Sequence, residues 1–541
     1  MKQKEALEIL KMGHNVFLTG AAGSGKTYIL NQYVTWLKDN GVSVGVTAST
    51  GIAATHMQGM TIHSWAGIGI KDDISFNDLK KMAEKSYLKK RFKYARVLII
   101  DEVSMLHHFR LDMVDNVCRA MKEDDRPFGG LQVVLCGDFF QLPPISHGPE
   151  KASFVYHSEV WNNMDLKVCY LDEQYRQQDA ELLNILNDIR SNKVTDATLN
   201  PLRQRYKKEV VGQVEPTKIF THNIDVDRIN EEALEKIDED EQAYEMIITG
   251  KQKLGEVLVK SCLAPEILRL KKNATVMFVK NNHDKGYVNG TLGMVVRFDE
   301  FGSPVVKTRD GVEITATPES WVIEEDGKVL AEISQVPLRL AWAITVHKSQ
   351  GMSLDAAEMD LSKSFEPGMG YVALSRVRTL DGLKMLGWGE KAGKVNEEVL
   401  EFDQEFKKEA ESVSEWLKSL DGAVIKKSQE DFFKGIKPTE KEKGANLSTY
   451  EQTKKLVMKK IPLGEIAKKR GVTVGAILTH LEKLKETSPE LDMSYLQPEK
   501  KRLAAIKKAF AKTDDLKLAP IRAKLGKSYS YEEIRLGRLF L

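Results

Sequence analysis

A glycine-rich segment near the start of the chain restricts the fold more than any other feature. Residues 20–27 read Gly-Ala-Ala-Gly-Ser-Gly-Lys-Thr, which matches the phosphate-binding pattern G-x-x-x-x-G-K-[ST]. An apolar run at 16–18 precedes this segment, and apolar residues at helical spacing follow it over 28–37. The pattern needs this order of strand, loop and helix, because its backbone N–H groups converge on phosphate at a helix N-terminus. The sequence therefore predicts an α/β fold with a nucleotide site.

The side chains of this segment have separate expected tasks. Lys26 reaches the β and γ oxygens of a nucleotide, and the hydroxyl of Thr27 ligates Mg²⁺. The glycines allow the backbone to approach the phosphates closely. ATP and Mg²⁺ are therefore the cofactors that the sequence predicts. The nucleotide-binding residues expected in this segment are Gly20, Gly23, Ser24, Gly25, Lys26 and Thr27.

A second apolar run, at 97–100, ends in two carboxylates, Asp101 and Glu102. After a phosphate-binding loop, the first carboxylate is expected to hold the metal, and the second is placed to polarise the attacking water as a general base. An Asp-Glu pair that follows an isolated strand is more often a turn or a helix cap. Together the two motifs predict only a nucleoside triphosphatase, because many proteins with different functions share them.

The remaining chain divides by the type of repeating pattern. Its 541 residues suffice for three to four domains of about 150 residues. Buried-strand runs alternate with helical stretches up to residue 170 and again from 338 to 386, which predicts two α/β lobes. Short strands with Asp-Gly turns lie between them. The expected divisions are 1–170 for the first lobe with a small insert at about 71–92, 171–267 and 336–394 for the second lobe, 268–335 for a small antiparallel β-barrel, 395–447 for a charged helical linker, and 448–541 for a helical C-terminal domain.

Six further segments carry polar residues at strand ends and loops, and they lie at 47–54, 61–67, 137–144, 172–177, 343–351 and 370–378. Examples are Gly-Asp-Phe-Phe-Gln-Leu-Pro-Pro at 137–144 and Gly-Tyr-Val-Ala-Leu-Ser-Arg-Val-Arg at 370–378. In this order they resemble the motifs of superfamily-one class-B helicases of the Pif-one and RecD-like type, over residues 3 to about 390. The resemblance implies two RecA-like P-loop lobes, an inserted SH3-like β-barrel and an all-α C-terminal extension. It also implies an ATP-dependent DNA helicase that translocates on single-stranded DNA from 5′ to 3′.

The resemblance implies roles for individual residues around the nucleotide. Gln3 is implied to read the adenine, and Gln141 is implied to lie near the γ-phosphate. Arg176 and Arg376 are implied to bring positive charge from the second lobe to a nucleotide held by the first. Closure of the lobes would then depend on the γ-phosphate, because charge that develops in phosphoryl transfer needs compensation. The second lobe is also implied to contact the nucleotide through Gln350 and Gly351.

The implied DNA contacts lie in both lobes. They reach phosphate and ribose and therefore carry little sequence information. Trp65 and the pair Phe139 and Phe140 offer rings that could stack on bases, although core packing is the more common fate of such side chains. The implied contacts are Thr50, Gly51, His63, Ser64 and Trp65 in the first lobe, and His347, Lys348 and Ser349 in the second.

The insert at 71–92 is rich in basic residues. By resemblance it is a small wedge that splits the duplex, but a solvated helix with no such role would have the same pattern. Its basic residues are Lys80, Lys81, Lys85, Lys89, Lys90 and Arg91.

The C-terminal part of the chain is basic, since residues 421–541 carry 27 Lys and Arg against 16 Asp and Glu. Residues 448–481 predict three short helices with Thr473 as the N-cap of the third, and they resemble the helix-turn-helix appended to some RecQ-type helicases. The third helix is expected to present Gly475, Thr479 and Lys483, which read no base edges, so sequence-specific binding is not expected. Either a contact with a duplex or partner protein or a packing scaffold fits this segment.

Composition restricts the remaining classes of function. The four cysteines are far apart and lack metal-ligand spacing, so neither a zinc site nor a disulfide framework is expected. The N-terminus lacks the core of a signal peptide, so an intracellular, non-secreted protein is expected, which in a bacterium would be cytoplasmic and nucleoid-associated, without membrane contact. We expect a monomer that acts on single-stranded and on forked or structured DNA. The alternatives are a nucleotide-switched binding protein and the motor subunit of a nuclease complex.

Overall fold

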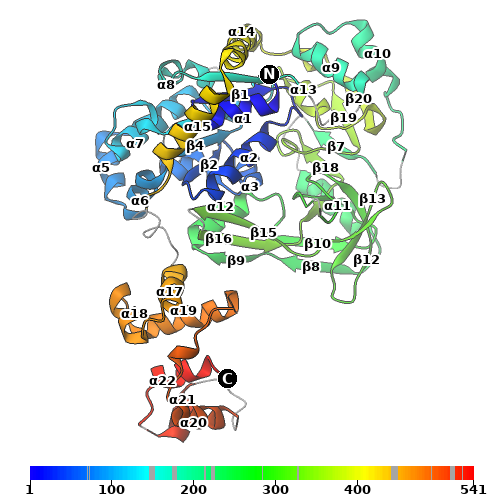
Figure 1. Ribbon diagram of the computed structural model, residues 1–541. Coiled ribbons are helices and arrows are strands. Elements are labelled where there is room, and N and C mark those ends of the chain that lie inside the picture. The colour runs from blue at the N-terminus through cyan, green and yellow to red at the C-terminus, as the bar shows by residue number, and fades with distance from the viewer. Residues whose placement is uncertain are drawn as a thin grey trace. The chain divides into compact units, whose positions relative to one another are not determined.

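The chain folds into two compact units, which comprise Met1–Lys437 and Pro438–Leu541 (Figure 1). The computed structural model describes all residues except 70, 72, 145–152, 174–178, 212–214, 221–225, 283, 326–327, 440–448, 489, 512–517 and 527. No helix among the described residues is long and apolar enough to cross a membrane.

The first lobe is built on a six-stranded parallel sheet with the strand order β3-β2-β4-β5-β1-β6. Every residue of β1, β4 and β5 is buried, as expected for a parallel sheet that is covered on both faces. The strands are β1 (Val16–Gly20), β2 (Val44–Ala48), β3 (Met60–Thr61), β4 (Val97–Asp101), β5 (Gln132–Cys136) and β6 (Lys167–Leu171). The helices are α1 (Gln3–Lys11), α2 (Lys26–Asp39), α3 (Gly51–His56), α4 (Ile62–Ala66), α5 (Phe76–Glu84), α6 (Ser86–Tyr94), α7 (His108–Lys122) and α8 (Glu159–Asn163).

The second lobe has a four-stranded parallel sheet with the order β18-β7-β19-β20. Its strands are β7 (Thr217–Phe220), β18 (Ala343–Thr345), β19 (Ala357–Leu361) and β20 (Leu383–Trp388). Its helices are α9 (Ala180–Arg190), α10 (Asp196–Gln204), α11 (Val226–Glu235) and α13 (Met369–Leu374). The predicted pair of α/β lobes is thus confirmed.

An antiparallel insert separates the halves of the second lobe and forms three small sheets with the orders β14-β13-β12-β11-β17, β15-β16-β9 and β10-β8. The insert was expected to begin at residue 268, but β8 pairs with β10 and β9 pairs with β16. The residues of β8 and β9 are mostly exposed, and neither segment alternates apolar with polar residues in the way that marks a half-buried strand. The elements are β8 (Glu241–Glu245), β9 (Ile247–Gly250), α12 (Gln252–Ser261), β10 (Ile267–Lys271), β11 (Thr275–Phe278), β12 (Leu292–Phe298), β13 (Pro304–Thr308), β14 (Glu313–Thr315), β15 (Glu319–Glu325), β16 (Lys328–Gln335) and β17 (Leu338–Leu340).

The segment expected to be a charged linker is instead part of the first unit. It forms α14 (Glu397–Ser419) and α15 (Gly422–Ile436), which contact β6 and α1 (Figure 1). Phe406 of α14 lies 5.1 Å from the ring of Phe17 in β1, and Ile436 of α15 joins the core of α1 and α2. The charged residues of these helices cover their outer faces, so composition alone hides the apolar stripe.

The C-terminal unit consists of short helices around two small apolar cores. Thr473 caps α19 as expected, since its hydroxyl accepts a hydrogen bond from the N–H of Ala476 at 3.2 Å. Gly471 ends α18 with a φ of +63°. The helices are α17 (Thr449–Met458), α18 (Leu463–Arg470), α19 (Val474–Thr487), α20 (Lys500–Phe510), α21 (Leu518–Leu525) and α22 (Tyr531–Arg538).

The packing of α14 generates a prediction about stability. Phe406→Ala should lower the free energy of unfolding by about 3–5 kcal/mol, because it leaves a cavity against the buried ring of Phe17. Denaturant unfolding of the full chain measures the effect. The exposed neighbour Gln404→Ala serves as the control and should change stability by less than about 0.5 kcal/mol. Equal stability of both variants would mean that α14 is not part of the core.

Candidate functional site

The glycine-rich loop has the strained backbone that its glycines permit. Gly20, Gly23 and Gly25 have φ values of +144°, +86° and +86°. A Cβ atom on Gly20 would lie 2.7 Å from the carbonyl oxygen of Leu171, so a larger residue does not fit there. Gly25 precedes the first residue of α2, Lys26, so the loop delivers the chain directly into a helix N-terminus.

The residues of this loop fit a nucleotide phosphate. The N-terminus of α2 has no side-chain cap in the described structure, which leaves its first N–H groups to an anionic ligand. The hydroxyl of Ser24 is fully buried with no hydrogen-bond partner. Lys26 Nζ donates to the carbonyl oxygens of Gly20 and Ala21 at 2.8 and 3.1 Å. Gln3 lies against the same loop, since its Nε2 donates to the carbonyl of Ser24 at 3.1 Å.

The two carboxylates at the end of β4, Asp101 and Glu102, lie within electrostatic reach of Lys26. Burial and the charge of Asp101 raise the pKa of Glu102 to about 7, and the charge of Lys26 opposes this rise. Burial also raises the pKa of Asp101. Glu102 has a φ of +54°, which is rare for a residue other than glycine.

The donor set suits Mg²⁺ that is bound together with a nucleotide. No cluster of three acidic, His or Cys ligands exists among the residues that the structure describes. One carboxylate, Asp101, and the exposed hydroxyl of Thr27 are the protein ligands that would hold the ion. Mg²⁺ commonly takes its other ligands from water and phosphate, so this sparse set fits the expected cofactor.

Residues of the second lobe reach this carboxylate pair. Gln350 Nε2 donates a hydrogen bond to Glu102 at 3.2 Å. Arg376 is 1% exposed, and its positive charge lowers the pKa of the same glutamate. The guanidinium is held by the carbonyl of Val372 at 2.9 Å and the hydroxyl of Ser375 at 2.7 Å. Lys26 and Arg376, from opposite lobes, therefore act on one group. The other expected arginine, Arg176, lies outside the described residues.

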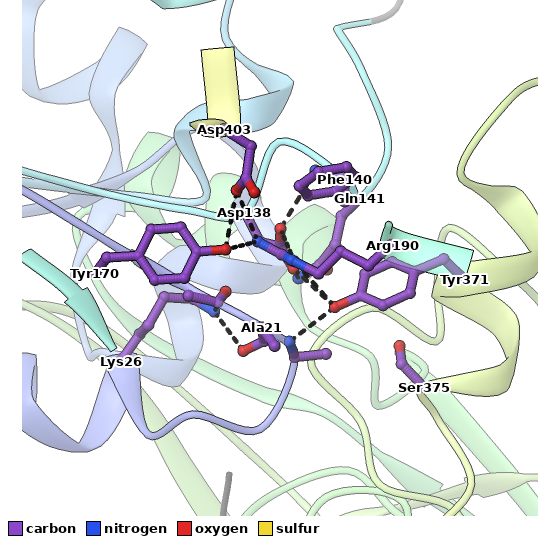
Figure 2. Close-up of polar contacts among 12 residues, drawn as sticks. Ala21, Lys26, Asp138, Phe140, Gln141, Tyr170, Arg190, Tyr371, Ser375 and Asp403 are labelled. Carbon is purple, nitrogen blue, oxygen red and sulfur yellow. Dashed lines mark hydrogen bonds and ion pairs between the residues drawn. The ribbon is translucent and has the colours of Figure 1, made fainter. Parts of the chain in front are cut away.

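A buried arginine that the sequence did not single out also lies between the lobes. Figure 2 shows Arg190 among Asp138, Tyr170, Tyr371 and Asp403. Its Nη1 donates to Asp138 at 2.7 Å, and its Nη2 donates to the hydroxyl of Tyr170 at 2.9 Å. Burial alone would raise the pKa of Asp138, but the charge of Arg190 and other positive groups outweighs it, so the pKa is lowered. In the sequence Arg190 only ends an apolar helix, and no motif marks it.

Gln141 lies at the same carboxylate. Its Nε2 is 3.4 Å from Asp138 Oδ2, and the residue is 7% exposed. Gln141 is therefore tied to the hydrogen-bond network of Arg190 (Figure 2), and its place near the γ-phosphate stays a prediction.

The structure places the ring of Trp65 in the core, the more common of the two fates considered for it, so the DNA contact that the resemblance implied for Trp65 is corrected. Trp65 is 3% exposed, and its ring packs against Phe92 with the centroids 4.9 Å apart. Phe139 and Phe140 are also buried. These rings belong to the large apolar core, in which Phe139 packs against Phe17. None of the three presents a face to a base.

The other expected DNA contacts of the first lobe lie on two short helices. Thr50 is the N-cap of α3, and its hydroxyl accepts from the N–H of Ala53 at 3.3 Å. Gly51 adjoins the insert, since a Cβ atom there would lie 2.1 Å from Ser261 Oγ in α12. His63 and Ser64 are half-buried on α4.

The second-lobe residues of this set divide into two groups. His347 and Lys348 are half-buried, and Lys348 Nζ lies 3.9 Å from Asp227. Ser349 is fully buried, and its hydroxyl donates to the carbonyl of Val346 at 2.8 Å. This hydroxyl stabilises a turn, so the expected DNA contact of Ser349 is corrected. Gly351 is exposed next to the His56 ring of the first lobe.

The basic insert forms α5 and α6 and is anchored by one of its own basic residues. Arg91 is 7% exposed, and its Nη1 donates to the carbonyls of Ser64 at 3.2 Å and Trp65 at 2.5 Å. This arginine therefore joins α6 to the end of α4. The exposed residues of the set are Lys80, Lys81, Lys85, Lys89 and Lys90.

Comparisons with known proteins decide the family. The PIF1-like helicase family model matches residues 2–197, the DNA helicase Pif1 2B domain matches residues 253–298, and a helix-turn-helix domain matches residues 449–538. The chain is 37% identical over 660 aligned residues to the ATP-dependent DNA helicase Pif1 of Psychrobacter sp. (strain PRwf-1), and the alignment covers all of both chains. The chain belongs to the Pif1 family of ATP-dependent DNA helicases.

Other members of the Pif1 family extend this result. The chain is 37% identical to the ATP-dependent DNA helicase PIF1 of Xenopus laevis over 413 residues, which cover 75% of this chain and 64% of that protein. Bacteroides sp Pif1 in complex with ADP-AlF4 aligns with a TM-score of 0.66 and 32% identity, over 75% of this chain and 96% of that one. Bacteroides Pif1 bound to ssDNA gives a TM-score of 0.53 and 33% identity over 76% and 97%.

The position of Glu102 generates a prediction about turnover. Glu102→Gln should lower ATP turnover by about 10²–10⁴-fold while nucleotide binding is retained, because the amide keeps the shape but cannot accept a proton. Steady-state ATPase assays and nucleotide titration measure the two effects. Glu123→Gln is the matched control, since Glu123 also has a φ of +54° but ends α7 away from the loop. Equal activity of the two variants would remove Glu102 from the reaction.

Proposed function

We propose that this protein hydrolyses ATP at the junction of its two lobes and uses the hydrolysis to move along single-stranded DNA from 5′ to 3′ and to separate a duplex. The observation that carries the proposal is the convergence of groups from both lobes on Glu102. Gln350 donates to this carboxylate, and the charges of Lys26 and Arg376 both act on it. A nucleotide bound by one lobe is therefore within the electrostatic reach of the other.

The chemistry follows from these positions. Amides of the glycine-rich loop and Lys26 bind the phosphates, and Glu102 accepts the proton of the attacking water. Arg376 compensates the negative charge that develops on the transferred group, and Arg176 is proposed to do the same. Loss of the γ-phosphate removes the negative charge that attracts the guanidinium groups of the second lobe, so the lobes separate. If each lobe holds a different part of one strand, each cycle moves the strand.

The proposed strand contacts are the half-buried residues on α3 and α4 of the first lobe, and His347 and Lys348 of the second. Contacts of this kind bind the backbone, so the motor would act on strands of any sequence. The α5–α6 insert, with its exposed lysines, is proposed to meet the duplex. Support comes from Bacteroides Pif1, which has been solved bound to ssDNA, and from a solved Pif1 complex described as unwinding forked dsDNA by two coordinating Pif1 helicases.

The C-terminal unit is proposed to contact duplex DNA through α17 and α18 and not through α19. Arg535 of α22 donates to the carbonyl of Gly475 at 3.1 Å and the hydroxyl of Thr479 at 2.8 Å, and it pairs with Glu482. Arg535 thus occupies hydrogen-bonding groups on the face that a helix-turn-helix would insert into a groove, although Thr479 itself stays exposed. Exposed lysines that suit a phosphate backbone are Lys455, Lys459, Lys468 and Lys469.

The motor proposal predicts the behaviour of two variants. Lys26→Ala should bind DNA but hydrolyse nothing, and Arg376→Ala should lose about 10³-fold in turnover while it still binds nucleotide. Strand separation is measured on duplexes with 5′ or 3′ overhangs, with and without ATP. Wild-type protein should separate only the 5′-tailed duplex. Unwinding by either variant would contradict the proposal.

The same assay tests the alternatives. A nucleotide-switched binding protein would change its DNA affinity with ATP but separate no strands. The motor subunit of a nuclease complex would separate strands and would cut only with a partner. Acceleration of hydrolysis by single-stranded DNA favours the motor over the switch.

The proposal for the C-terminal unit predicts a change in salt dependence. Replacing four exposed lysines by Gln, one in α17, one directly after it and two in α18, should weaken duplex binding and reduce the slope of log affinity against log salt by up to about 3, because fewer counterions are released. Fluorescence anisotropy with a blunt duplex at several salt concentrations measures the slope. The residues are Lys455, Lys459, Lys468 and Lys469.

A matched control removes the same charge from α20. Its four exposed lysines should leave the slope nearly unchanged when replaced by Gln, and they are Lys500, Lys501, Lys507 and Lys508. An equal reduction of the slope in both variants would assign the effect to net charge alone. An unchanged slope in both would contradict the proposed contact with duplex DNA.

A further inference from the structure

The hydroxyl of one buried tyrosine of the second lobe contacts the phosphate-binding loop of the first. The N–H of Ala22 donates to Tyr371 OH at 3.0 Å. Tyr371 OH donates to Asp138 Oδ2 at 3.1 Å, and Arg190 Nη1 donates to the same hydroxyl at 3.2 Å (Figure 2). A phenol has one donor and two acceptor positions, so this oxygen is saturated. Tyr371 is 1% exposed.

The four groups come from both sides of the junction. Ala22 lies in the loop after β1, and Asp138 follows β5, so both belong to the first lobe. Tyr371 is on α13, and Arg190 ends α9, so both belong to the second. Hydrogen bonds between the lobes thus meet at one oxygen atom.

Arg190 is held in place from its other side. Its Nη2 donates to Tyr170 OH, and this hydroxyl donates to Asp403 at 2.9 Å. The guanidinium also lies over the ring of Phe140, 4.2 Å from the centroid. The planar guanidinium donates hydrogen bonds to several partners at once in fixed directions, which a lysine ammonium cannot do in the same way. Arg190 therefore fixes the position of both Asp138 and Tyr371.

The contact with Ala22 has a chemical competitor. The N–H groups of this loop bind the phosphates of a nucleotide, and one N–H donates well to only one acceptor. A phosphate oxygen is charged and accepts a stronger hydrogen bond than a neutral phenol. Phosphate binding and the link from Ala22 to Tyr371 are thus alternatives for one donor.

We propose that the Tyr371 hydroxyl competes with nucleotide phosphate for the N–H of Ala22, and that Arg190 is the positioning residue that holds it there. This inference rests on the proposed ATP site. Displacement of the phenol would change the position of Arg376. This arginine follows α13, and its Nε donates to the carbonyl of Val372, the residue next to Tyr371. Tyr371 and Arg190 therefore connect phosphate binding at the loop to Arg376, the arginine proposed to compensate charge on the transferred group.

Tyr371→Phe tests the competition, because it removes one oxygen atom and keeps the buried ring. The variant should bind N-methylanthraniloyl AMP-PNP with Mg²⁺ about 3- to 10-fold more tightly than wild type, the effect of one competing hydrogen bond. A purely structural role for the hydroxyl would leave affinity unchanged or weaken it. Thermal unfolding confirms that the variant is folded. Unchanged or weaker binding by folded protein overturns the proposal.

Tyr156→Phe is the matched control. Tyr156 is also buried, and its hydroxyl donates to the carboxylate of Glu398 at 2.8 Å, with no contact to the loop. Its loss should leave nucleotide affinity unchanged. A similar gain in both variants would assign the effect to general loosening of the fold and would overturn the competition.

Arg190→Lys tests the positioning role. It should raise affinity less than Tyr371→Phe does, and the double variant should bind no more tightly than Tyr371→Phe alone, since both act through one hydroxyl. Additive effects would contradict a shared route. Failure of the ATP site itself is distinguishable, because wild-type protein would then not bind the probe at all.

Discussion

Charge balance across the junction of two lobes is the constraint on which the rest of the structure depends. Two carboxylates of the first lobe, the buried Asp138 and the half-buried Glu102, face the buried guanidinium groups of Arg190 and Arg376 in the second. A buried charge without a partner is costly, so each lobe stabilises groups that the other could not bury alone. The junction is therefore sensitive to any added anion, and a nucleotide triphosphate is such an anion.

The local part of this arrangement was predictable from the sequence. The loop at 20–27, the strand that ends at Asp101 and the alternation of two α/β lobes follow from short-range patterns, and the structure has them. Gln3 could be assigned only by resemblance; the structure places it against Ser24 of the loop, and its role in reading adenine stays a prediction. The loop and strand patterns depend on residues that are close together in the sequence, so they can be recognised without the structure.

The remaining features depend on contacts between distant segments. Arg190 has no motif, and it becomes informative only when Asp138 and Tyr371 surround it. Trp65 and Ser349 sit in motifs whose polar neighbours suggest DNA contact, but tertiary packing buries both side chains. The same reason explains α14 and α15, whose charged outer faces give the composition of a linker while their inner faces complete the core of the first lobe.

The placement of α15 has a consequence for the connection of the two units. Its last residue, Ile436, shares a core with Ile9 and Leu10 of α1, and Gln429 donates to the carbonyl of Glu8. The first unit ends directly after this helix, at Lys437. The first unit therefore ends on a helix that packs on the first lobe, so the C-terminal unit is joined in sequence to that lobe and not to the second.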